Sequence, residues 1–195
     1  MLKEGRPRDA EILSYEEILA EHGTLLMQTR ARLVEELSPL AAAAQNIVSG
    51  KNEPLTLQYL PASGPDLRES MLQARERETR LRQAVVGPHR DDLLLRLHGM
   101  PAADFASEGQ QRTIALALKL AQGKLLESSG GRTPLYLMDD IFGELDPGRR
   151  NALMSHLPPL AQKWITTTHL DWLHETPELG EIGRFRVHCG TCKTA

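Results

Sequence analysis

Apolar side chains recur at three- and four-residue steps across residues 15–37, which is the pattern of a long amphipathic helix. Ser14 followed by Glu17 forms a capping-box pattern, so we expect this helix to begin there. A Ser-Pro pair at residues 38–39 predicts a break and a second helix, PLAAAAQNIVSG, for which Gly50 is the C-terminal stop. The apolar positions of the first helix are Ile18, Leu19, Leu25, Leu26, Leu33, Val34 and Leu37.

The segment that follows predicts a strand, a loop and a third helix. LTLQYL, residues 55–60, alternates in polarity and predicts a strand, and PASGP at residues 61–65 predicts a surface loop. The third helix, from about Pro65 to Gln83, interleaves arginines with glutamates. This pattern is typical of a solvated face, and we favour that interpretation over a partial phosphate-binding surface because the acids cancel much of the positive field. The charged positions are Arg68, Arg75, Arg77, Arg80, Arg82, Glu69, Glu76 and Glu78.

From Val85 onward, predicted strands and helices alternate, which favours an α/β layered domain. LLLRL at residues 93–97 predicts a strand, and a buried helix follows Ser107. PLYLM at residues 134–138 is a continuous apolar run, typical of a central parallel strand covered on both faces. A helix is expected to open at Asp146 and Pro147, KWITTT predicts a further strand, and RFRVHCG predicts a closing strand and turn.

Composition narrows the classes of function. The 195 residues are 41% hydrophobic and 25% charged, with a net charge of −3 and 4% aromatic residues. The charge excludes a globally basic nucleic-acid binder, and the few aromatics argue against a single-strand binder built on base stacking. No apolar run matches a membrane span and the first residues lack a signal-peptide segment, so a cytoplasmic location is expected. Cys189 and Cys192 with His188 are too few ligands for zinc, which favours two reduced thiols in a terminal hairpin.

Two short stretches carry candidate chemistry. Asp139 and Asp140 follow the apolar run, where a carboxylate pair at the end of a buried strand suggests hydrated Mg²⁺ beside a phosphate; a strand that ends in an Asx turn would look similar. Ser107 and Gln110 form a second capping box, and Gly109 leaves the backbone open to close approach. The free N–H groups and positive dipole of a helix N-terminus favour a phosphate, although the same box can simply cap a core helix.

The order of the motifs indicates a family. GPHRDD, ASEGQQR, LYLMDD, GELD and ITTTH occur at residues 87–92, 106–112, 135–140, 143–146 and 165–169. This series resembles the later half of ATP-binding-cassette (ABC) ATPases and, more narrowly, the RecF family of recombinational-repair ATPases related to SMC proteins. One departure is Ala106, where the family pattern usually has Leu or Phe before the serine.

The resemblance implies roles for individual residues. Ser107, Glu108, Gly109 and Gln110 would be the signature motif, which contacts the γ-phosphate of ATP bound by the opposite subunit. Asp139 would be the Walker B acid on Mg²⁺, and Asp140 the catalytic acid that orients or activates water. Gly143, Glu144, Leu145 and Asp146 would form the D-loop, and His169 would occupy the switch position.

No G-x-x-x-x-G-K-[ST] motif occurs in the 195 residues. The resemblance therefore implies the C-terminal half of an ABC-type P-loop ATPase head, residues 86–195, with part of a mostly helical arm lobe, residues 1–85. Because the phosphate-cradling loop is missing, we expect this chain alone to lack ATPase activity.

The resemblance also implies partners and a biological role. These are DNA replication and repair, recombinase loading on single-stranded or gapped duplex DNA, SOS induction, an ATP-dependent homodimer, and RecO- and RecR-like mediators. One alternative is a non-catalytic module that binds DNA or a partner, for which the arginine-bearing third helix and Arg90, Arg112, Arg149 and Arg150 would carry the binding. Another is a different SMC-class ATPase, disfavoured because the arm is short and lacks sustained heptads.

Overall fold

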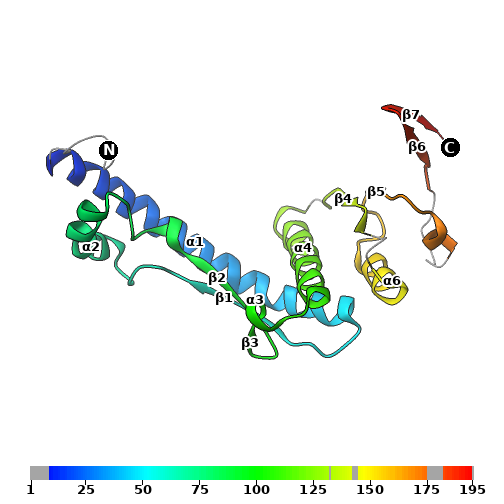
Figure 1. Ribbon diagram of the computed structural model, residues 1–195, viewed down its shortest axis with the longest axis horizontal. Coiled ribbons are helices and arrows are strands. Elements are labelled where there is room, and N and C mark those ends of the chain that lie inside the picture. Colours follow the sequence, from blue (N-terminus) through cyan, green and yellow to red (C-terminus); the bar gives the residue numbers. More distant parts are fainter. Residues whose placement is uncertain (1–8, 132, 142–144, 175–181, 195) are drawn as a thin grey trace. The chain divides into compact units, whose positions relative to one another are not determined.

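The computed structural model describes residues 9–131, 133–141, 145–174 and 182–194 (Figure 1). The chain divides into two compact units, Met1–Arg132 and Thr133–Ala195. The first unit holds α1 (Asp9–Ser49), β1 (Leu55–Leu60), α2 (Leu67–Leu81), the 3₁₀ turn η1 (Pro88–Arg90), β2 (Asp92–Leu97), β3 (Met100–Pro101), α3 (Ala102–Phe105) and α4 (Glu108–Gly130). The second holds β4 (Tyr136–Asp139), α6 (Pro147–His156), β5 (Lys163–Thr166), the 3₁₀ turn η2 (Asp171–His174), β6 (Phe185–His188) and β7 (Thr191–Thr194). The boundary near residue 85, between a helical arm lobe and an ATPase head, stays a prediction.

Helix α1 is one continuous element of 41 residues, and two predictions about it are wrong. Ser14 lies inside the helix instead of capping it, and Pro39 does not break it. An interior proline costs about 3 kcal/mol because it removes a backbone hydrogen bond. The turns after Pro39 offset this cost through packing, since Ala41, Ala44 and Val48 are fully buried. The predicted stop at Gly50 is confirmed by its positive φ of 64°.

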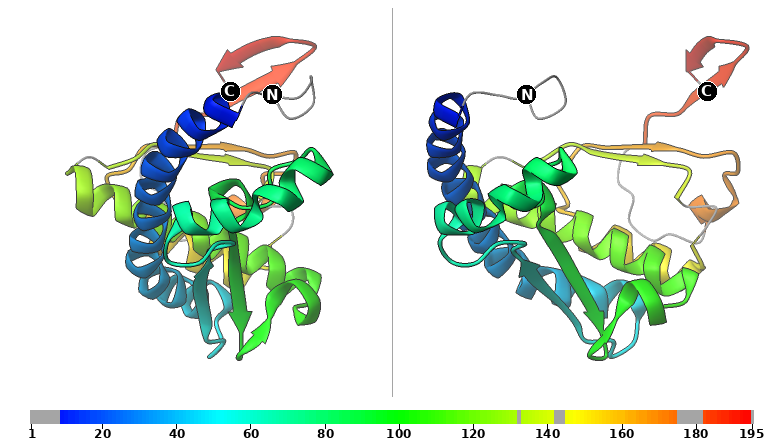
Figure 2. Two further views of the ribbon diagram at one scale, coloured as in Figure 1. Left: turned by 90° about the vertical axis from the view of Figure 1, so that its left-hand side faces the viewer. Right: turned by 60° about the vertical axis from the view of Figure 1, so that its left-hand side comes forward.

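The predicted strand at residues 55–60 is confirmed as β1, which pairs antiparallel with β2 from Leu55↔Leu97 to Leu60↔Asp92. Figure 2 shows this hairpin beside α1 and α4. Alternate residues of β1 point inward, so Leu55 and Leu57 are buried. They join a core that also contains Ala41, Leu97, Ala102, Ile114 and Ala121. This core fixes the N-terminal half of α4 against the C-terminal half of α1 and the hairpin.

Helix α2 packs on the N-terminal half of α1 through close apolar contact. Leu67 is buried, and a Cβ added at Gly23 would lie 2.6 Å from its Cδ2 atom, so any larger residue at position 23 would displace Leu67. Asp66 caps α2 by accepting a hydrogen bond from the Glu69 amide. The start of α2 is therefore fixed by a cap and by a close helix contact.

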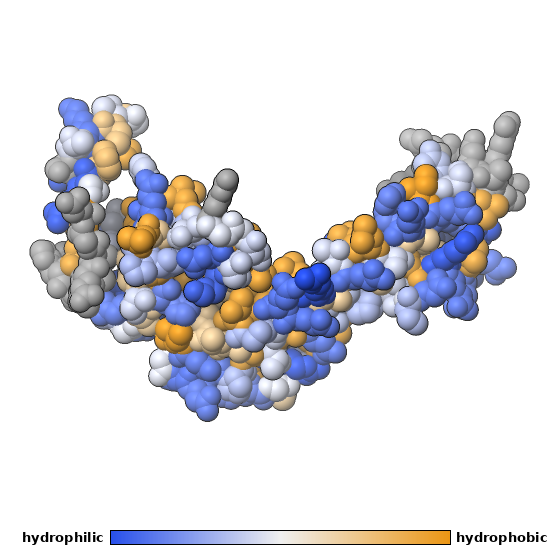
Figure 3. Space-filling view, turned by 180° about the vertical axis from the view of Figure 1, so that it is seen from behind, coloured by the Kyte–Doolittle hydropathy of each residue, from blue (hydrophilic) through white to orange (hydrophobic). Residues whose placement is uncertain are grey.

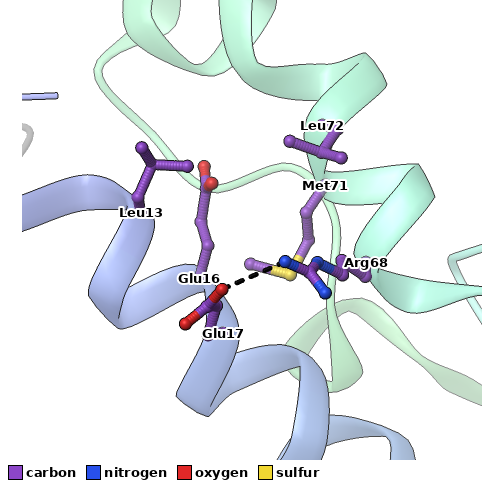
Figure 4. A pocket seen from close by; sticks show the side chains of 6 residues that line it. All are labelled: Leu13, Glu16, Glu17, Arg68, Met71 and Leu72. Carbon is purple, nitrogen blue, oxygen red and sulfur yellow. Dashed lines mark hydrogen bonds and ion pairs between the residues drawn. The ribbon is translucent and has the colours of Figure 1, made fainter. Parts of the chain in front are cut away.

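The expectation that α2 exposes a solvated charged face is only partly right. Arg68 pairs with Glu17 at 3.0 Å, and the guanidinium of Arg75 donates two hydrogen bonds to Glu16 of α1. Figure 4 shows the Arg68–Glu17 pair in a small pocket between the two helices. The pocket is lined by Leu13, Glu16, Glu17, Arg68, Met71 and Leu72. Two of the arginines therefore hold the helices together.

In the second unit, β4 and β5 form a parallel pair from Tyr136↔Lys163 to Asp139↔Thr166. We expected the apolar run of β4 to be covered on both faces, and this is wrong for the described residues. Met138 is buried, but Leu137 is 73% exposed. The reason is that the described part of this unit supplies only two strands to the sheet.

The C-terminal segment forms the hairpin β6–β7, which confirms the predicted closing strand and turn. Cys189 and Cys192 are both free and exposed, as expected for reduced thiols in a hairpin. Trp164 of β5 stacks on Phe185 of β6 with ring centroids 6.2 Å apart. No helix in the described residues is both long and apolar enough to cross a membrane.

Candidate functional site

The N-terminus of α4 has the capping geometry predicted from the sequence. The Ser107 hydroxyl oxygen accepts a hydrogen bond from the Gln110 amide at 3.3 Å, and the Gln110 side-chain oxygen accepts from the Ser107 amide at 3.0 Å. The first amides of a helix have no intrahelical partner and lie at the positive end of its dipole, so this end can bind an anion. Glu108 is exposed in the same turn, and its negative charge opposes such an anion.

The N-terminus of α4, where the predicted signature motif lies, is tied to α1 through a residue that the sequence analysis missed. The Gln110 side-chain nitrogen donates to Glu53 Oε1 at 3.1 Å, across 57 positions of sequence. Glu53 lies in the loop after α1 and is only 7% exposed. No spacing rule connects residues this far apart, so the sequence carries no signal for this contact.

The acid pair lies at the carboxyl end of β4, as predicted. The Thr166 hydroxyl, at the end of the paired strand β5, donates a hydrogen bond to Asp139 Oδ1. The Asp140 amide donates to the Thr166 carbonyl at 3.1 Å, and Asp140 adopts a left-handed φ of 48°. Thr166 is a second residue that the sequence analysis did not assign to the site; its place in ITTTH, next to the predicted switch, was the available signal.

The premise that led us to a metal at this pair is wrong, because both carboxylates are exposed and their charges are not desolvated by burial. The oxygen chemistry still fits Mg²⁺. The described residues contain no group of three or more His, Cys, Asp and Glu side chains able to hold a metal ion. Hydrated Mg²⁺ does not need such a group, since it binds through one or two carboxylates with waters and phosphate oxygens. Asp139 and Asp140 are suitable ligands of that kind.

The predicted D-loop is described only at its end, since Gly143 and Glu144 lie outside the described residues. Leu145 is buried, and Asp146 caps α6 by accepting from the Arg149 amide at 3.0 Å. This confirms the helix start predicted at Asp146.

Arg149 and Arg150, which we proposed for DNA contact, bond within this same loop. Arg149 Nε lies 3.3 Å from Asp146 Oδ2, and Arg150 donates to the Leu145 carbonyl at 3.1 Å. Both side chains are partly buried and hold the loop against α6. A role for either in DNA binding stays a prediction.

His169 lies in a turn fixed by Thr167. The Thr167 hydroxyl donates to the His169 carbonyl at 2.8 Å and accepts from the Trp172 ring nitrogen at 3.3 Å. His169 itself is exposed, three residues beyond the threonine that contacts Asp139. The acid pair therefore lies at the end of β4, and the predicted switch residue lies just beyond the end of the paired strand β5.

The other two arginines proposed for DNA binding lie in the first unit. The Arg90 guanidinium donates to the Ala84 carbonyl at 3.0 and 3.3 Å, which closes the loop before β2. Arg112 is exposed on the first turns of α4.

The GPHRDD motif has a structural role that the sequence did not reveal. The Asp91 side chain is 2% exposed and accepts hydrogen bonds from the Tyr59 hydroxyl, the Ala62 amide at 2.9 Å and Arg30 of α1 at 3.3 Å. Arg30 also donates to the Pro88 carbonyl at 2.5 Å. Burial, together with the hydrogen bond and negative charge of Asp91, raises the pKa of Tyr59 to about 12. The motif thus fastens the β1–β2 hairpin to α1.

No profile of a known protein family matches the chain. Individual proteins do. The DNA replication and repair protein RecF of Rippkaea orientalis is 42% identical over 189 residues, which is 89% of this chain and 50% of the relative. RecF of Cyanothece sp. strain PCC 7425 is 39% identical over 205 residues, covering 97% of this chain and 54% of the relative.

Solved structures agree with the sequence matches. A structure described as the recombination mediator protein RecF-ATP in the RecFOR pathway superposes with a TM-score of 0.82 at 25% identity, over 100% of this chain and 52% of that one. A related RecF-ATPrS structure gives a TM-score of 0.81. These matches confirm the predicted RecF resemblance and the mixed helix-and-strand fold of ABC-ATPase type. The chain spans about half the length of the relatives it matches.

Proposed function

We propose that this chain, a homologue of RecF over about half of that protein's length, works as part of a RecF-type DNA replication and repair ATPase. In that role it supplies the signature end of α4 and the Walker B acid pair. The observation that carries the proposal is the match of the whole chain to a RecF-ATP structure, together with the motif residues at the N-terminus of α4 and the carboxyl end of β4.

The chemistry of the first element supports ATP binding in trans. The first amides of α4 can donate hydrogen bonds to the terminal phosphate of ATP held by another subunit, and the Ser107 hydroxyl can do so when it turns away from the Gln110 side-chain oxygen. The capping box positions this turn before any phosphate arrives. Glu108 makes binding of a free anion unfavourable. We therefore expect this turn to bind a nucleotide phosphate whose negative charge is already partly neutralised by Mg²⁺ and by the arginine and lysine side chains of the subunit that holds the nucleotide.

The acid pair, Asp139 and Asp140, has the chemistry to support hydrolysis. Mg²⁺ would supply charge neutralisation at the phosphates, and Asp139 would hold it. Thr166 orients Asp139 through its hydroxyl and Asp140 through its carbonyl. Asp140 is exposed, and its carboxylate can accept a hydrogen bond from the attacking water and orient it.

The exposed apolar side chains of the second unit favour the idea that another protein segment packs on this sheet. Leu135, directly before β4, is 51% exposed, Leu137 on β4 is 73% exposed, and Trp164 on β5 is 53% exposed. Figure 3 shows apolar patches among the polar ones on one face of the molecule. A two-stranded sheet is marginal in water, so we infer that the half of a RecF-type protein that this chain does not match completes this sheet and carries the Walker A loop.

The wider role follows from the family. We propose ATP-dependent homodimerisation on single-stranded or gapped DNA, recombinase loading with RecO- and RecR-like mediators, and a part in the SOS response to DNA damage. Loss of the γ-phosphate contacts at Ser107 after hydrolysis would open the dimer, as in other nucleotide switches.

A chimera tests the proposal. The matching half of Rippkaea orientalis RecF is replaced by this chain, and ATP turnover is measured with Mg²⁺ and gapped DNA. We expect the chimera to hydrolyse ATP, Asp140→Asn to lower turnover by about 100-fold or more, and Asp92→Asn to have no effect. The 195-residue chain alone should show no turnover, because nothing in it cradles the β- and γ-phosphates. Turnover by the chain alone that Asp140→Asn abolishes would contradict this assignment.

A further inference from the structure

Glu53 is a buried carboxylate that joins two helices. Its Oε2 atom accepts from the Gln45 side-chain nitrogen of α1 at 3.0 Å, and its Oε1 atom accepts from the Gln110 side-chain nitrogen of α4 at 3.1 Å. Its own amide donates to the Lys51 carbonyl at 3.0 Å and to Asn46 Oδ1 at 3.2 Å. Both ends of this residue are therefore fixed.

Burial of this carboxylate is costly. Among the described residues no cation forms an ion pair with Glu53, and its residue exposure is 7%. A buried charge held only by neutral donors is less stable than a well-packed apolar side chain of similar size. Two amide donors, one from each helix, are what this carboxylate gains in return. The arrangement therefore favours a role in fixing those amides.

The orientation of the Gln110 amide is set by Glu53. Both oxygens of Glu53 accept hydrogen bonds from side-chain amides, and this arrangement requires the nitrogen of Gln110 to face the carboxyl group. The Gln110 oxygen then faces Ser107, where it accepts from the backbone amide at 3.0 Å and from the hydroxyl at 3.2 Å. The reverse orientation would place the Gln110 nitrogen against the Ser107 amide, which are both donors, and the Gln110 oxygen against Glu53 Oε1, which are both acceptors. Glu53 thus selects the one orientation of Gln110 that completes the capping box.

We infer that Glu53 is a positioning residue for the signature end of α4, acting through Gln110 on Ser107. It sets where the Ser107 hydroxyl and amide point, and it links that position to α1. The meaning of this geometry for a nucleotide phosphate rests on the proposed function above, but the geometry itself does not.

An exchange of side chains across the contact gives a specific test. In Gln110→Glu, the new carboxylate can still accept from Ser107, since glutamate suits this capping-box position, but it faces Glu53 without a donor. In the double variant Glu53→Gln/Gln110→Glu, the glutamine introduced at position 53 donates through its nitrogen to the new carboxylate, and its oxygen accepts from Gln45. The hydrogen bond between positions 53 and 110 is thereby restored, with the donor and the acceptor exchanged.

The readout is backbone amide hydrogen exchange by NMR on the 195-residue chain without nucleotide. Gln110→Glu should speed exchange of the Ser107 amide by about tenfold, while amides of Leu120 and Ala121 in the middle of α4 keep their rates. The double variant should return Ser107 to within about threefold of the wild-type rate. Gln45→Met, which removes only the α1 donor, is the matched control and should leave Ser107 within the same range.

Three results would overturn the inference if the Gln110→Glu variant folds. These are a double variant no better than Gln110→Glu, an unchanged Ser107 rate in Gln110→Glu, and equal acceleration along all of α4, which indicates general loss of stability. If Gln110→Glu does not fold, recovery of a folded chain with wild-type Ser107 exchange in the double variant supports the inference, and failure of both overturns it. Because no nucleotide is present, these outcomes are independent of the chimera's ATPase result.

Discussion

Replacement of Asp91 by alanine tests the idea that the GPHRDD motif fastens the hairpin to α1. Asp91 comes directly before β2, and its side chain accepts hydrogen bonds from three different segments. The donors are Arg30 in α1, Tyr59 in β1 and the Ala62 amide in the following loop. Alanine removes all three acceptor contacts at once and leaves the donors in place.

The expected loss can be worked from these contacts. A hydrogen bond to a charged acceptor contributes about 1.5 kcal/mol or more, and a buried donor left unpaired adds its desolvation cost. The Arg30 side chain is 40% exposed, so water replaces much of its lost contact. Ala62 is exposed as well, so Tyr59 accounts for most of the effect, and we expect Asp91→Ala to lower the free energy of unfolding by about 2 kcal/mol.

Urea unfolding followed by far-UV circular dichroism measures this change. Asp92→Ala is the matched control, since Asp92 is exposed and, within the described part of the chain, its side chain accepts only from the adjacent Leu93 amide. The control should change the free energy of unfolding by no more than about 0.5 kcal/mol. If Asp91→Ala costs less than about 1 kcal/mol at an unchanged m-value, the three contacts do not hold the hairpin and the reasoning fails.

Two further predictions concern the first unit. The pKa of Tyr59 is raised from 10.0 to about 12, so the neutral phenol is favoured in the folded state, and its contribution to stability is complete below pH 10 and lost as the pH rises to about 12. Urea midpoints between pH 9 and about 12 should show this loss in the wild type and not in Tyr59→Phe; equal slopes would contradict it. Arg75→Ala should cost about 1 kcal/mol, because its two hydrogen bonds to Glu16 are partly buried, whereas Arg68→Ala should cost about half of that or less. Equal effects of the two arginine variants in urea unfolding would show that burial does not distinguish the pairs.

Local patterns in the sequence predicted the short elements well. The alternation of LTLQYL predicted β1, and the capping residues Ser107 and Asp146 marked the starts of α4 and α6. These features depend on residues within a few positions of one another. Ser14 and Pro39 show where the same rules fail. At Pro39, packing of the following turns of α1 outweighs the local signal.

Contacts between distant residues could not be predicted in this way. Glu53 reaches Gln110 across 57 positions, and Thr166 reaches Asp139 across 27. Either contact depends on the three-dimensional path of the chain. The exposure of Leu137 was missed for a different reason: its apolar run predicts a covered strand, and the described residues do not supply the cover.

Helix α1 is held by polar contacts at three places along its length. Near its start Glu16 pairs with Arg75 of α2, in its middle Arg30 pairs with Asp91, and near its end Gln45 contacts Glu53. Apolar packing resists displacement, and the hydrogen bonds add a directional restraint because they lose their energy within a small displacement. A shift of the N-terminus of α4 therefore either breaks the Glu53 contact or moves α1 along with it. If α1 moves, α2 and the β1–β2 hairpin move with it, because the Glu16–Arg75 and Arg30–Asp91 contacts join them to α1.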